Sequence, residues 1–364
     1  MNALIIAGEA SGDLYGGKLS SVLQQRIPSI RLAGMGGSRM AAAGVEILYD
    51  SSNVSVVGVF EVVGKLVHLR RAFSSLRSWI ETNAPDFAIL IDFPDFNFRL
   101  ARILKKQKVP IFYFISPQIW AWRKRRIHFL RDHVKLMISI LPFEKKLYEK
   151  AGVQVVYVGH PLVEMVQEEL RRQSTYPRSG KILVGIMPGS RDVEVTRHLP
   201  VLIDTISLIK KSREIECVLI WPPSLPASDT VLPSGITVIK ENRYAAMQAC
   251  DLLLVASGTS TLESAILGTP LFIMYKVSPL SWKLGKLLVQ VPHYGLVNWI
   301  AGAKYIPEYM QSRMNPDLLA SDALRFLDDP GQQQMMKEQL KKIVDALGPP
   351  GAMERAADAI LERL

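Results

Sequence analysis

A carboxylate stands directly after one of the most apolar segments of the chain. Residues 87–91 read Phe-Ala-Ile-Leu-Ile, and Asp92 follows them at once. A charge at the end of a buried strand is costly unless it is used or paired. Partial burial also raises the pKa of a carboxyl group, which suits it to general-base work. We therefore predict Asp92 as the catalytic residue, and Asp95 as the cap of the helix that follows.

A second polar turn follows the first apolar segment, residues 4–7. Residues 8–13 read Gly-Glu-Ala-Ser-Gly-Asp, without the spacing of a dinucleotide-binding fingerprint. Its two glycines and serine would let a ligand approach exposed backbone N–H groups. The turn is equally consistent with a tight bend in which Asp13 caps the next helix. Both interpretations stay open, and Glu9, Ser11 and Asp13 are the candidate ligand-binding residues here.

Two further turns in the second half have the composition of phosphate-binding loops. Gly189, Ser190 and Arg191 follow the apolar residues 182–187, and their N–H groups and guanidinium suit a diphosphate. The second loop follows residues 252–255, and its candidate residues are Ser257, Gly258, Thr259, Ser260, Thr261 and Glu263. Its hydroxyls would bind phosphate without a metal, and Glu263 would accept both hydroxyls of a ribose. The alternatives are an ordinary turn with Arg191 in solvent, and a capping box of Ser260 and Glu263.

Metal and membrane-spanning signals are weak in this sequence. The six histidines form no H-E-x-x-H pattern and none lies beside a cysteine pair, and no D-x-D pair occurs, so we expect no metal and no cofactor. No stretch approaches the roughly 20 apolar residues of a membrane span. The short apolar start, residues 1–7, reads as a strand rather than a signal peptide. Cys217 and Cys250 are too few for a disulfide scaffold, which favours a reducing compartment.

The charge of the chain points to anionic partners. The formal net charge is +10, and basic residues gather in three groups within residues 65–77, 99–108 and 123–135. Each group alone is consistent with a solvated helix face, but three in one half favour a surface that meets an anionic partner, whether phosphate, nucleic acid or acidic lipid. Residues 54–64 are strongly apolar and lead into the first group. They predict either a buried strand or part of a lipid-facing surface.

The elements that must position these loops alternate between apolar runs and amphipathic helices, which predicts parallel α/β sheets. The hydrophobic content of 48% supports an ample core. We predict a first domain over residues 1–165, a linker over 166–180, a second domain over 181–345 and a C-terminal helix over 346–364. The predicted strands are residues 4–7, 87–91, 111–115, 136–141 and 155–158, then 182–187, 217–220, 236–239, 252–255 and 271–274. The fold class is thus α/β, with two Rossmann-like domains and a cleft between them.

The ordered set of motifs resembles the lipid-A-disaccharide synthase family, a group of bacterial glycosyltransferases. The match runs along nearly the whole chain. It comprises residues 8–13, 57–58 with 61–62, 92–97, 116–118 with 120–123, 141–144, 158–160, 188–191, 257–259 with 262–263, and Asn298 before residues 301–302.

The resemblance implies a GT-B architecture and a specific reaction. UDP-2,3-diacylglucosamine would be the donor and 2,3-diacylglucosamine 1-phosphate, called lipid X, the acceptor. The products would be the β-1,6-linked disaccharide 1-phosphate and UDP. It also implies that the first domain binds the acceptor, with Glu9, Ser11 and Asp13 as candidates and Asp92 as base. Arg191, Glu263 and Asn298 would belong to the donor site.

The same resemblance implies a cytoplasmic enzyme held peripherally at the inner membrane, and a homo-oligomer is possible. Nucleic acid is not an expected partner, because no recognisable binding motif occurs. Two alternatives stay open at this point. One is an enzyme like UDP-N-acetylglucosamine 2-epimerase, which shares the two-domain architecture and the UDP site. The other is a basic phospholipid-binding protein without catalytic activity.

Overall fold

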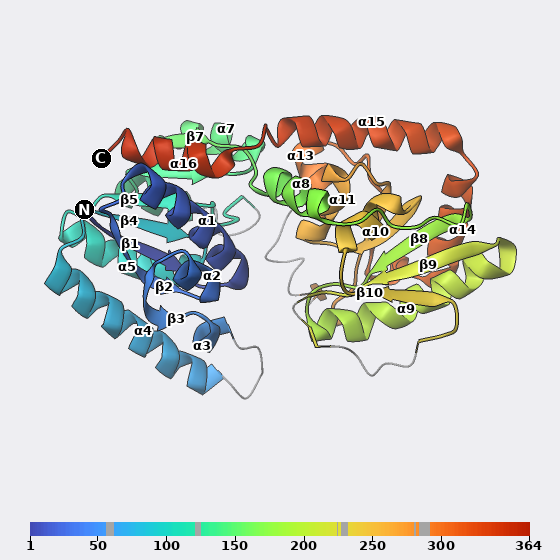
Figure 1. Ribbon diagram of the computed structural model, residues 1–364, viewed down its shortest axis with the longest axis horizontal. Coiled ribbons are helices and arrows are strands. Elements are labelled where there is room, and N and C mark those ends of the chain that lie inside the picture. The colour runs from blue at the N-terminus through green and yellow to red at the C-terminus, as the bar shows by residue number, and fades with distance from the viewer. Residues whose placement is uncertain (56–61, 121–124, 224, 227–231, 280–281, 284–291) are drawn as a thin grey trace. The chain divides into compact units, whose positions relative to one another are not determined.

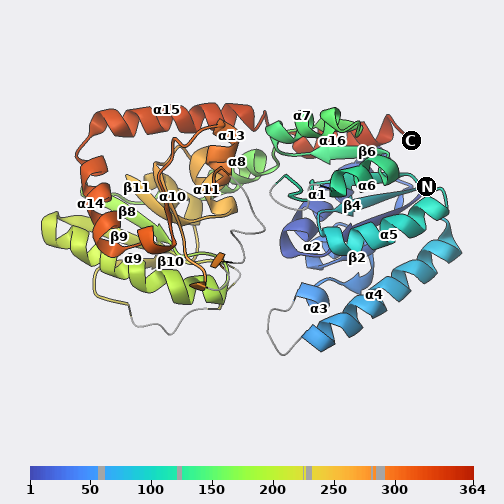
Figure 2. The same cartoon turned by 180° about the vertical axis from the view of Figure 1, so that it is seen from behind.

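The computed structural model describes residues 1–55, 62–120, 125–223, 225–226, 232–279, 282–283 and 292–364. It divides into two compact units. Unit 1 comprises Met1–Pro161 and Pro349–Leu364, and unit 2 comprises Leu162–Gly348. Each unit is a parallel sheet with helices on both faces, which confirms the predicted fold class (Figures 1 and 2).

The sheet of unit 1 has seven parallel strands in the order β3-β2-β1-β4-β5-β6-β7. The strands are β1 (Asn2–Ala7), β2 (Arg31–Gly36), β3 (Glu46–Asp50), β4 (Phe87–Ile91), β5 (Ile111–Phe114), β6 (Leu136–Ser139) and β7 (Val155–Tyr157). β2 and β3 were not predicted, because β2 contains two glycines and β3 is only half-buried. Gly34 is required in β2, since a Cβ there would lie 1.8 Å from the carbonyl oxygen of Ile5.

Unit 1 has helices on both faces of its sheet. They are α1 (Ala10–Arg26), α2 (Ser38–Ala42), α3 (Ser52–Ser55), α4 (Val62–Asn83), α5 (Pro94–Lys106), α6 (Arg126–His133), α7 (Pro142–Lys150) and α16 (Ala352–Leu361). The C-terminal helix α16 packs on α1, and Arg355 Nε donates to the Val158 carbonyl at 2.8 Å (Figure 1). The chain therefore returns to unit 1 at its end. Most of the apolar segment 54–64 lies outside the described residues.

The sheet of unit 2 has six parallel strands in the order β10-β9-β8-β11-β12-β13. The strands are β8 (Ile182–Met187), β9 (Ile215–Ile220), β10 (Ile236–Ile239), β11 (Leu252–Ala256), β12 (Leu271–Tyr275) and β13 (Glu308–Met310). The helices are α8 (Leu162–Arg172), α9 (Asp192–Ser212), α10 (Arg243–Ala249), α11 (Thr259–Ile266), α13 (Leu296–Ala301), η2 (Gln311–Arg313), α14 (Pro316–Leu327) and α15 (Pro330–Ala346). β13 was not predicted, because three residues carry no periodic signal.

The boundary between the units differs from the predicted linker. It falls at Pro161, and α8 belongs to unit 2, where Leu162, Val163 and Val166 enter the hydrophobic core. The polar residues that follow are also anchored to unit 2, because Arg178 Nη2 donates to Asp251 Oδ2 at 2.9 Å. The polar composition of residues 166–180 thus marks an ordered surface segment of unit 2. No helix among the described residues is long and apolar enough to cross a membrane.

Candidate active site

The predicted loops of unit 1 emerge side by side from its sheet. β1 pairs with β4, with Ala7 opposite Ile91, and the strand order reverses between these two strands. Ligands of open α/β sheets bind at such a reversal, beyond the carboxyl ends of the strands. The motif of residues 8–13 follows β1 and the motif of residues 92–97 follows β4, so both begin at this point and run into the helices α1 and α5. The structure therefore brings together two motifs that lie more than 70 residues apart in sequence.

Asp92 has a backbone conformation that its neighbours must hold in place. Its φ is +41° and that of Phe93 is +46°, both in the left-handed region that ordinary residues avoid. The Asp92 carbonyl accepts hydrogen bonds from Asn97 Nδ2 at 2.7 Å and from the Tyr113 hydroxyl at 2.6 Å. Strained backbone of this kind persists only where surrounding contacts enforce it, and it concentrates at functional sites.

The pKa of the Asp92 carboxyl group is raised by burial, as the sequence analysis predicted. Burial, and then the negative charge of Glu9, raise its pKa to about 6, although a backbone hydrogen bond of Phe93 opposes them. A carboxylate with this pKa is ionised at neutral pH and still accepts a proton readily. Glu9 itself is exposed and has no side-chain capping bond at the start of α1. Its negative charge therefore links the loop after β1 to Asp92 in the loop after β4.

The other carboxylates of these loops have structural partners. Asp13 lies inside α1 rather than at its cap, which corrects the capping interpretation. Its buried carboxylate accepts backbone N–H bonds from Gly37 at 2.6 Å, Arg39 at 3.0 Å and Met40 at 3.1 Å, and so caps α2. Asp95 lies in the first turn of α5, whose N-cap is Phe93, and pairs with Arg126. The predicted cap at Asp95 is therefore wrong, because the helix begins earlier, at Pro94. Ser11 is exposed.

A buried network adjoins these loops at the ends of β5 and β6. Glu144 is 1% exposed and accepts hydrogen bonds from Trp120 Nε1 at 3.0 Å and Ser139 Oγ at 2.7 Å. Burial raises its pKa to about 7, although hydrogen bonds from Ser139, Trp120 and Ser116 oppose this. Sequence reasoning assigned Glu144 no role. Its position fixes the segment after β5, next to the strand that carries Asp92.

The two predicted phosphate loops of unit 2 also start from neighbouring strands. β8 pairs with β11, and the strand order reverses between them. The loop of Gly189, Ser190 and Arg191 follows β8, and the loop of residues 257–261 follows β11. Both therefore lie where a nucleotide binds in sheets of this type.

Glu194 shapes the first of these loops, a role that the sequence did not reveal. Its carboxylate accepts from the Ser190 N–H at 2.9 Å, from Arg191 Nη1 at 3.0 Å and from the Tyr275 hydroxyl at 2.9 Å. Although burial opposes it, these hydrogen bonds hold the pKa of Glu194 below its ordinary value. Gly189 has φ +123°, and a Cβ there would collide with Glu194. The side chain of Arg191 remains 68% exposed and can therefore reach a ligand.

The second loop opens α11 with Gly258 as its N-cap. Ser260 lies inside the helix, so the predicted capping box with Glu263 is wrong. Ser257 Oγ donates to the Tyr294 carbonyl at 3.0 Å, and Thr261 Oγ1 donates to the Gly258 carbonyl at 2.8 Å. Two of the four hydroxyls thus shape the loop. Those of Thr259 and Ser260 have no protein partner in the described part of the chain.

Glu263 is held by a pair of residues that sequence reasoning missed. Its Oε1 accepts from Arg243 Nη2 at 2.9 Å and from the Tyr244 hydroxyl at 2.8 Å. The Arg243 guanidinium also lies over the Tyr244 ring, 4.5 Å from the centroid. Arg243 and Tyr244 are the first two residues of α10, which follows β10. Their position after the carboxyl end of a strand is the sequence signal that could have indicated them as site residues. All these bonds use one oxygen, so the second oxygen of the carboxylate can accept from a ligand.

Asn298 has a different environment from the other donor-site candidates. It is fully buried, and its Nδ2 donates to the Ile306 carbonyl at 2.8 Å and to Glu308 Oε1 at 2.9 Å. Its Oδ1 accepts from the N–H groups of Tyr305 at 3.1 Å and Ile306 at 2.9 Å. An asparagine amide offers two donors and two lone pairs, and all are used here. Asn298 therefore ties α13 to the segment before β13.

Solved structures that superpose on the whole chain include glycosyltransferases and UDP-GlcNAc 2-epimerases. The glycotransferase of kitacinnamycin superposes with a TM-score of 0.66 at 15% identity, covering 100% of this chain and 99% of its own. The UDP-GlcNAc 2-epimerase of Neisseria meningitidis bound to UDP-GlcNAc gives 0.64 at 12% identity, covering 100% of both chains. At these identities the likeness shows the fold alone. It confirms the predicted GT-B architecture.

Sequence relatives are more specific. A family model described as lipid-A-disaccharide synthetase matches residues 3–361. The lipid-A-disaccharide synthase of Syntrophus aciditrophicus is 42% identical, covering 97% of this chain and 95% of the relative. That of Geobacter sulfurreducens is 40% identical, covering 99% and 97%. Since the matches span almost the whole of each chain, the chain belongs to the lipid-A-disaccharide synthetase family.

Proposed function

We propose that this glycosyltransferase forms the lipid A disaccharide with Asp92 as its base and with UDP bound by the two loops of unit 2. The donor is UDP-2,3-diacylglucosamine and the acceptor is lipid X. The products are the β-1,6-linked disaccharide 1-phosphate and UDP. The observation that carries the mechanism is the constrained position of Asp92 at the strand-order reversal of unit 1, with its pKa raised to about 6.

The reaction is a single displacement. Asp92 takes the proton of the acceptor 6-hydroxyl as that oxygen attacks the anomeric carbon of the donor. The bond from this carbon to the UDP oxygen breaks on the opposite face, so the configuration inverts. A base of this kind typically contributes about 10²–10⁴-fold to the rate. Glu9 assists indirectly, because its negative charge keeps Asp92 a stronger base.

The leaving UDP gains negative charge in the same step. Arg191 supplies a guanidinium to the diphosphate, and the amino-terminal turns of α9 and α11 add backbone N–H donors. The hydroxyls of Thr259 and Ser260 stand at the start of α11 for the same purpose. Glu263 accepts the ribose hydroxyls through the oxygen that Arg243 and Tyr244 leave open. The scheme assigns charge stabilisation to protein groups and requires no metal.

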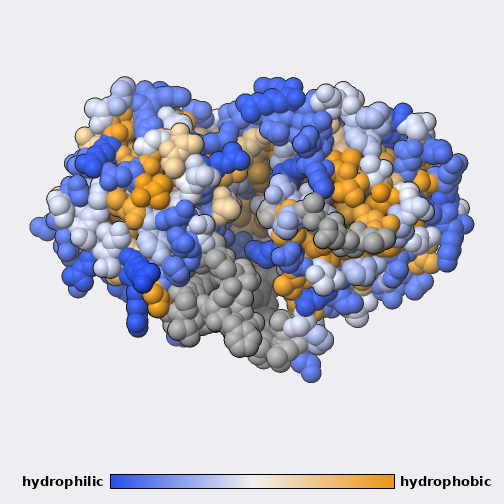
Figure 3. Space-filling model, turned by 60° about the horizontal axis from the view of Figure 1, so that its bottom comes forward, coloured by the Kyte–Doolittle hydropathy of each residue, from blue (hydrophilic) through white to orange (hydrophobic). Residues whose placement is uncertain are grey.

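The lipid substrates place the enzyme at a membrane surface, and we propose peripheral binding on the cytoplasmic face of the inner membrane. The support comes from α4, where Val67, Arg70 and Arg71 are all exposed. Cationic groups beside an exposed apolar side chain favour an anionic bilayer surface. Figure 3 shows hydrophobic patches mixed with hydrophilic residues on one face of the molecule.

One assay tests the function. The protein is incubated with UDP-2,3-diacylglucosamine and lipid X, and the lipid products are separated by mass. We expect the disaccharide 1-phosphate and equimolar UDP, and Asp92→Ala should remove most turnover while UDP binding persists. Epimerised donor, or substrate binding without a disaccharide, would refute the proposal. Activity should also survive EDTA, and strict dependence on added Mg²⁺ would refute the metal-free scheme.

A further inference from the structure

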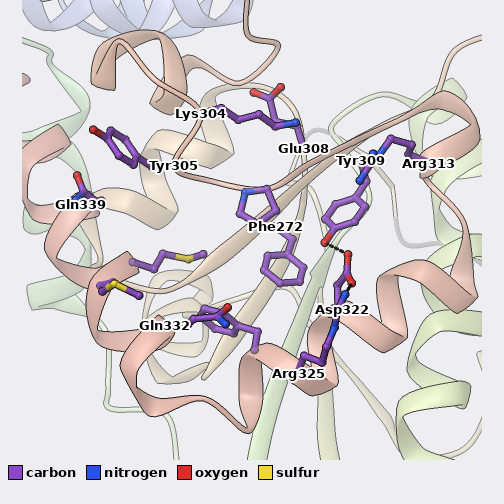
Figure 4. Close-up of a pocket in the computed structure, with 14 residues that line it drawn as sticks. Phe272, Lys304, Tyr305, Glu308, Tyr309, Arg313, Asp322, Arg325, Gln332 and Gln339 are labelled. Atoms are coloured by element: carbon purple, nitrogen blue, oxygen red, sulfur yellow. Dashed lines mark hydrogen bonds and ion pairs between the residues drawn. The ribbon is translucent and has the colours of Figure 1, made fainter.

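Unit 2 contains a second concave site that the glycosyl transfer does not use. It is a cavity of about 650 Å³ along the edge strand β13, between that strand and helices α14 and α15 (Figure 4). β12 separates β13 from β11, so this cavity and the two phosphate loops belong to different strands of the sheet. Its volume lies within the usual range of small-molecule sites, roughly 300–1,000 Å³.

One part of the cavity is apolar and open. Phe272 and Phe326 are buried in its floor, whereas Tyr305 and Met335 are 51% and 59% exposed at its lining. Met335 is the most exposed large hydrophobic side chain of the described residues, and Tyr305 is also among the most exposed. Apolar side chains left in water around a concavity are characteristic of binding sites.

The rest of the lining carries unpaired positive charge. Lys304 and Arg313 are exposed, and neither forms an ion pair with a carboxylate within the described residues. The two carboxylates of the cavity are already engaged. Asp322 accepts from the Tyr309 hydroxyl at 2.7 Å and pairs with Arg325, as Figure 4 shows in part. Glu308 accepts from the Gly295 N–H at 2.9 Å and from Asn298.

We propose that this cavity binds an anionic amphiphile, with its acidic head between Lys304 and Arg313. The apolar chain lies along Phe272, Tyr305 and Met335. A free phosphate would use the two cations and leave the apolar lining in water, and a neutral lipid would do the reverse. An amphiphile with one anionic head matches both parts of the lining at once.

The cavity lining contains none of the proposed reacting groups. Two of its residues, however, belong to a segment that supports the loop after β11. Tyr305 lines the cavity, and its N–H donates to Asn298 Oδ1 at 3.1 Å. Glu308 lines it as well and bonds the N–H of Tyr294, whose carbonyl accepts from Ser257. The cavity lining is therefore hydrogen-bonded to the residues that support the loop after β11.

The test is a binding titration with dodecyl phosphate, kept below its micelle concentration and followed by calorimetry. UDP is present at saturation so that the donor loops are filled. We expect Lys304→Glu combined with Arg313→Glu to raise the Kd at least tenfold, and Met335→Asp to raise it several-fold. The matched control is Lys337→Glu with Lys342→Glu, the same charge change at two exposed positions of α15 outside the cavity. It should stay within twofold of the unaltered protein.

Three results would overturn the proposal. They are no binding of dodecyl phosphate, equal weakening by the control pair, and inorganic phosphate or dodecanol binding as tightly as dodecyl phosphate. Because dodecyl phosphate also resembles an acylated sugar phosphate, the titration is repeated with Asp92→Ala, which should leave the cavity's affinity unchanged. Disaccharide formation by the Lys304→Glu, Arg313→Glu variant separates this site from the proposed function, since that activity should persist.

Discussion

The ring of Phe93 occupies the space where a side chain at Gly8 would begin. A Cβ built on Gly8 would lie 2.3 Å from two atoms of that ring. Gly8 directly follows β1, and Phe93 follows Asp92 after β4, so this contact joins the two loops at the strand-order reversal of unit 1. The absence of a side chain at residue 8 is what allows Phe93, and with it the left-handed Asp92, to take this position.

Gly8→Ala should therefore disturb the position of Asp92, and not only the turn after β1. The methyl group would push Phe93 away, at a cost of about 1–3 kcal/mol for overpacking. We expect a lower free energy of unfolding in urea and a reduced kcat. Gly331→Ala is the control, because the nearest atom to its Cβ is a side-chain oxygen 3.2 Å away. Full activity of Gly8→Ala would show that the contact does not position Asp92.

Asp92→Asn should abolish the proton acceptor while keeping the shape of the side chain. We expect kcat to fall by about 10²–10⁴-fold, with the melting temperature and the Kd for UDP unchanged. Asp95→Asn is the matched control, since Asp95 lies three residues away and is exposed. Steady-state rates with both substrates measure the effect. Comparable losses in the two variants would assign the defect to the loop as a whole.

The pH dependence of the rate should report the pKa of Asp92. Since the base must be ionised, kcat/KM should be constant above about pH 6 and fall tenfold per pH unit below it. Glu9→Gln removes a negative charge that raises this pKa, so the acid limb should move to lower pH. Glu149→Gln, at an exposed position of α7, should leave it in place. An acid limb that does not move in Glu9→Gln contradicts the coupling.

Glu144 should make the stability of the protein depend on pH. Its pKa is about 7 in the folded protein against an ordinary value of 4.5. As the pH rises through this interval, the unfolded chain releases the proton first, so the free energy of unfolding falls and levels off above about pH 7. The loss is on the order of 3 kcal/mol relative to Glu144→Gln, which cannot titrate. Urea unfolding of both proteins at several pH values measures the difference, and parallel curves would contradict the raised pKa.

Glu263 and Asn298 should respond differently to substitution, although both were predicted for the donor site. Glu263→Gln should raise the Kd for UDP about tenfold, because a hydrogen bond to a charged group contributes about 1.5–3 kcal/mol. Asn298→Ala should instead lower the melting temperature, since it leaves buried groups of Ile306 and Glu308 without partners. Calorimetric titration and thermal unfolding separate the two effects. A higher Kd for UDP with an unchanged melting temperature in Asn298→Ala would indicate that Asn298 belongs to the donor site.

The amino-acid sequence by itself determined the central strands and the loops that follow them. β4 and β8 begin and end as predicted, because parallel strands covered on both faces must be continuously apolar. The edge strand β10 also has the predicted bounds, although it is only half-buried. The family could also be recognised from the order of the loop motifs. Strands that depart from this pattern could not be found, as the glycines of β2 and the three residues of β13 show.

Only the tertiary structure decided which loops meet and which polar side chains are already in use. Strand order is set by long-range pairing, so the proximity of Gly8 to Phe93 leaves no local trace in the sequence. The same holds for Asp13, whose partners begin 24 residues later, and for Glu194 of α9, which bonds Tyr275 at the end of β12. A hydrogen-bonding residue type shows that a partner is needed, but the fold decides whether protein or ligand supplies it.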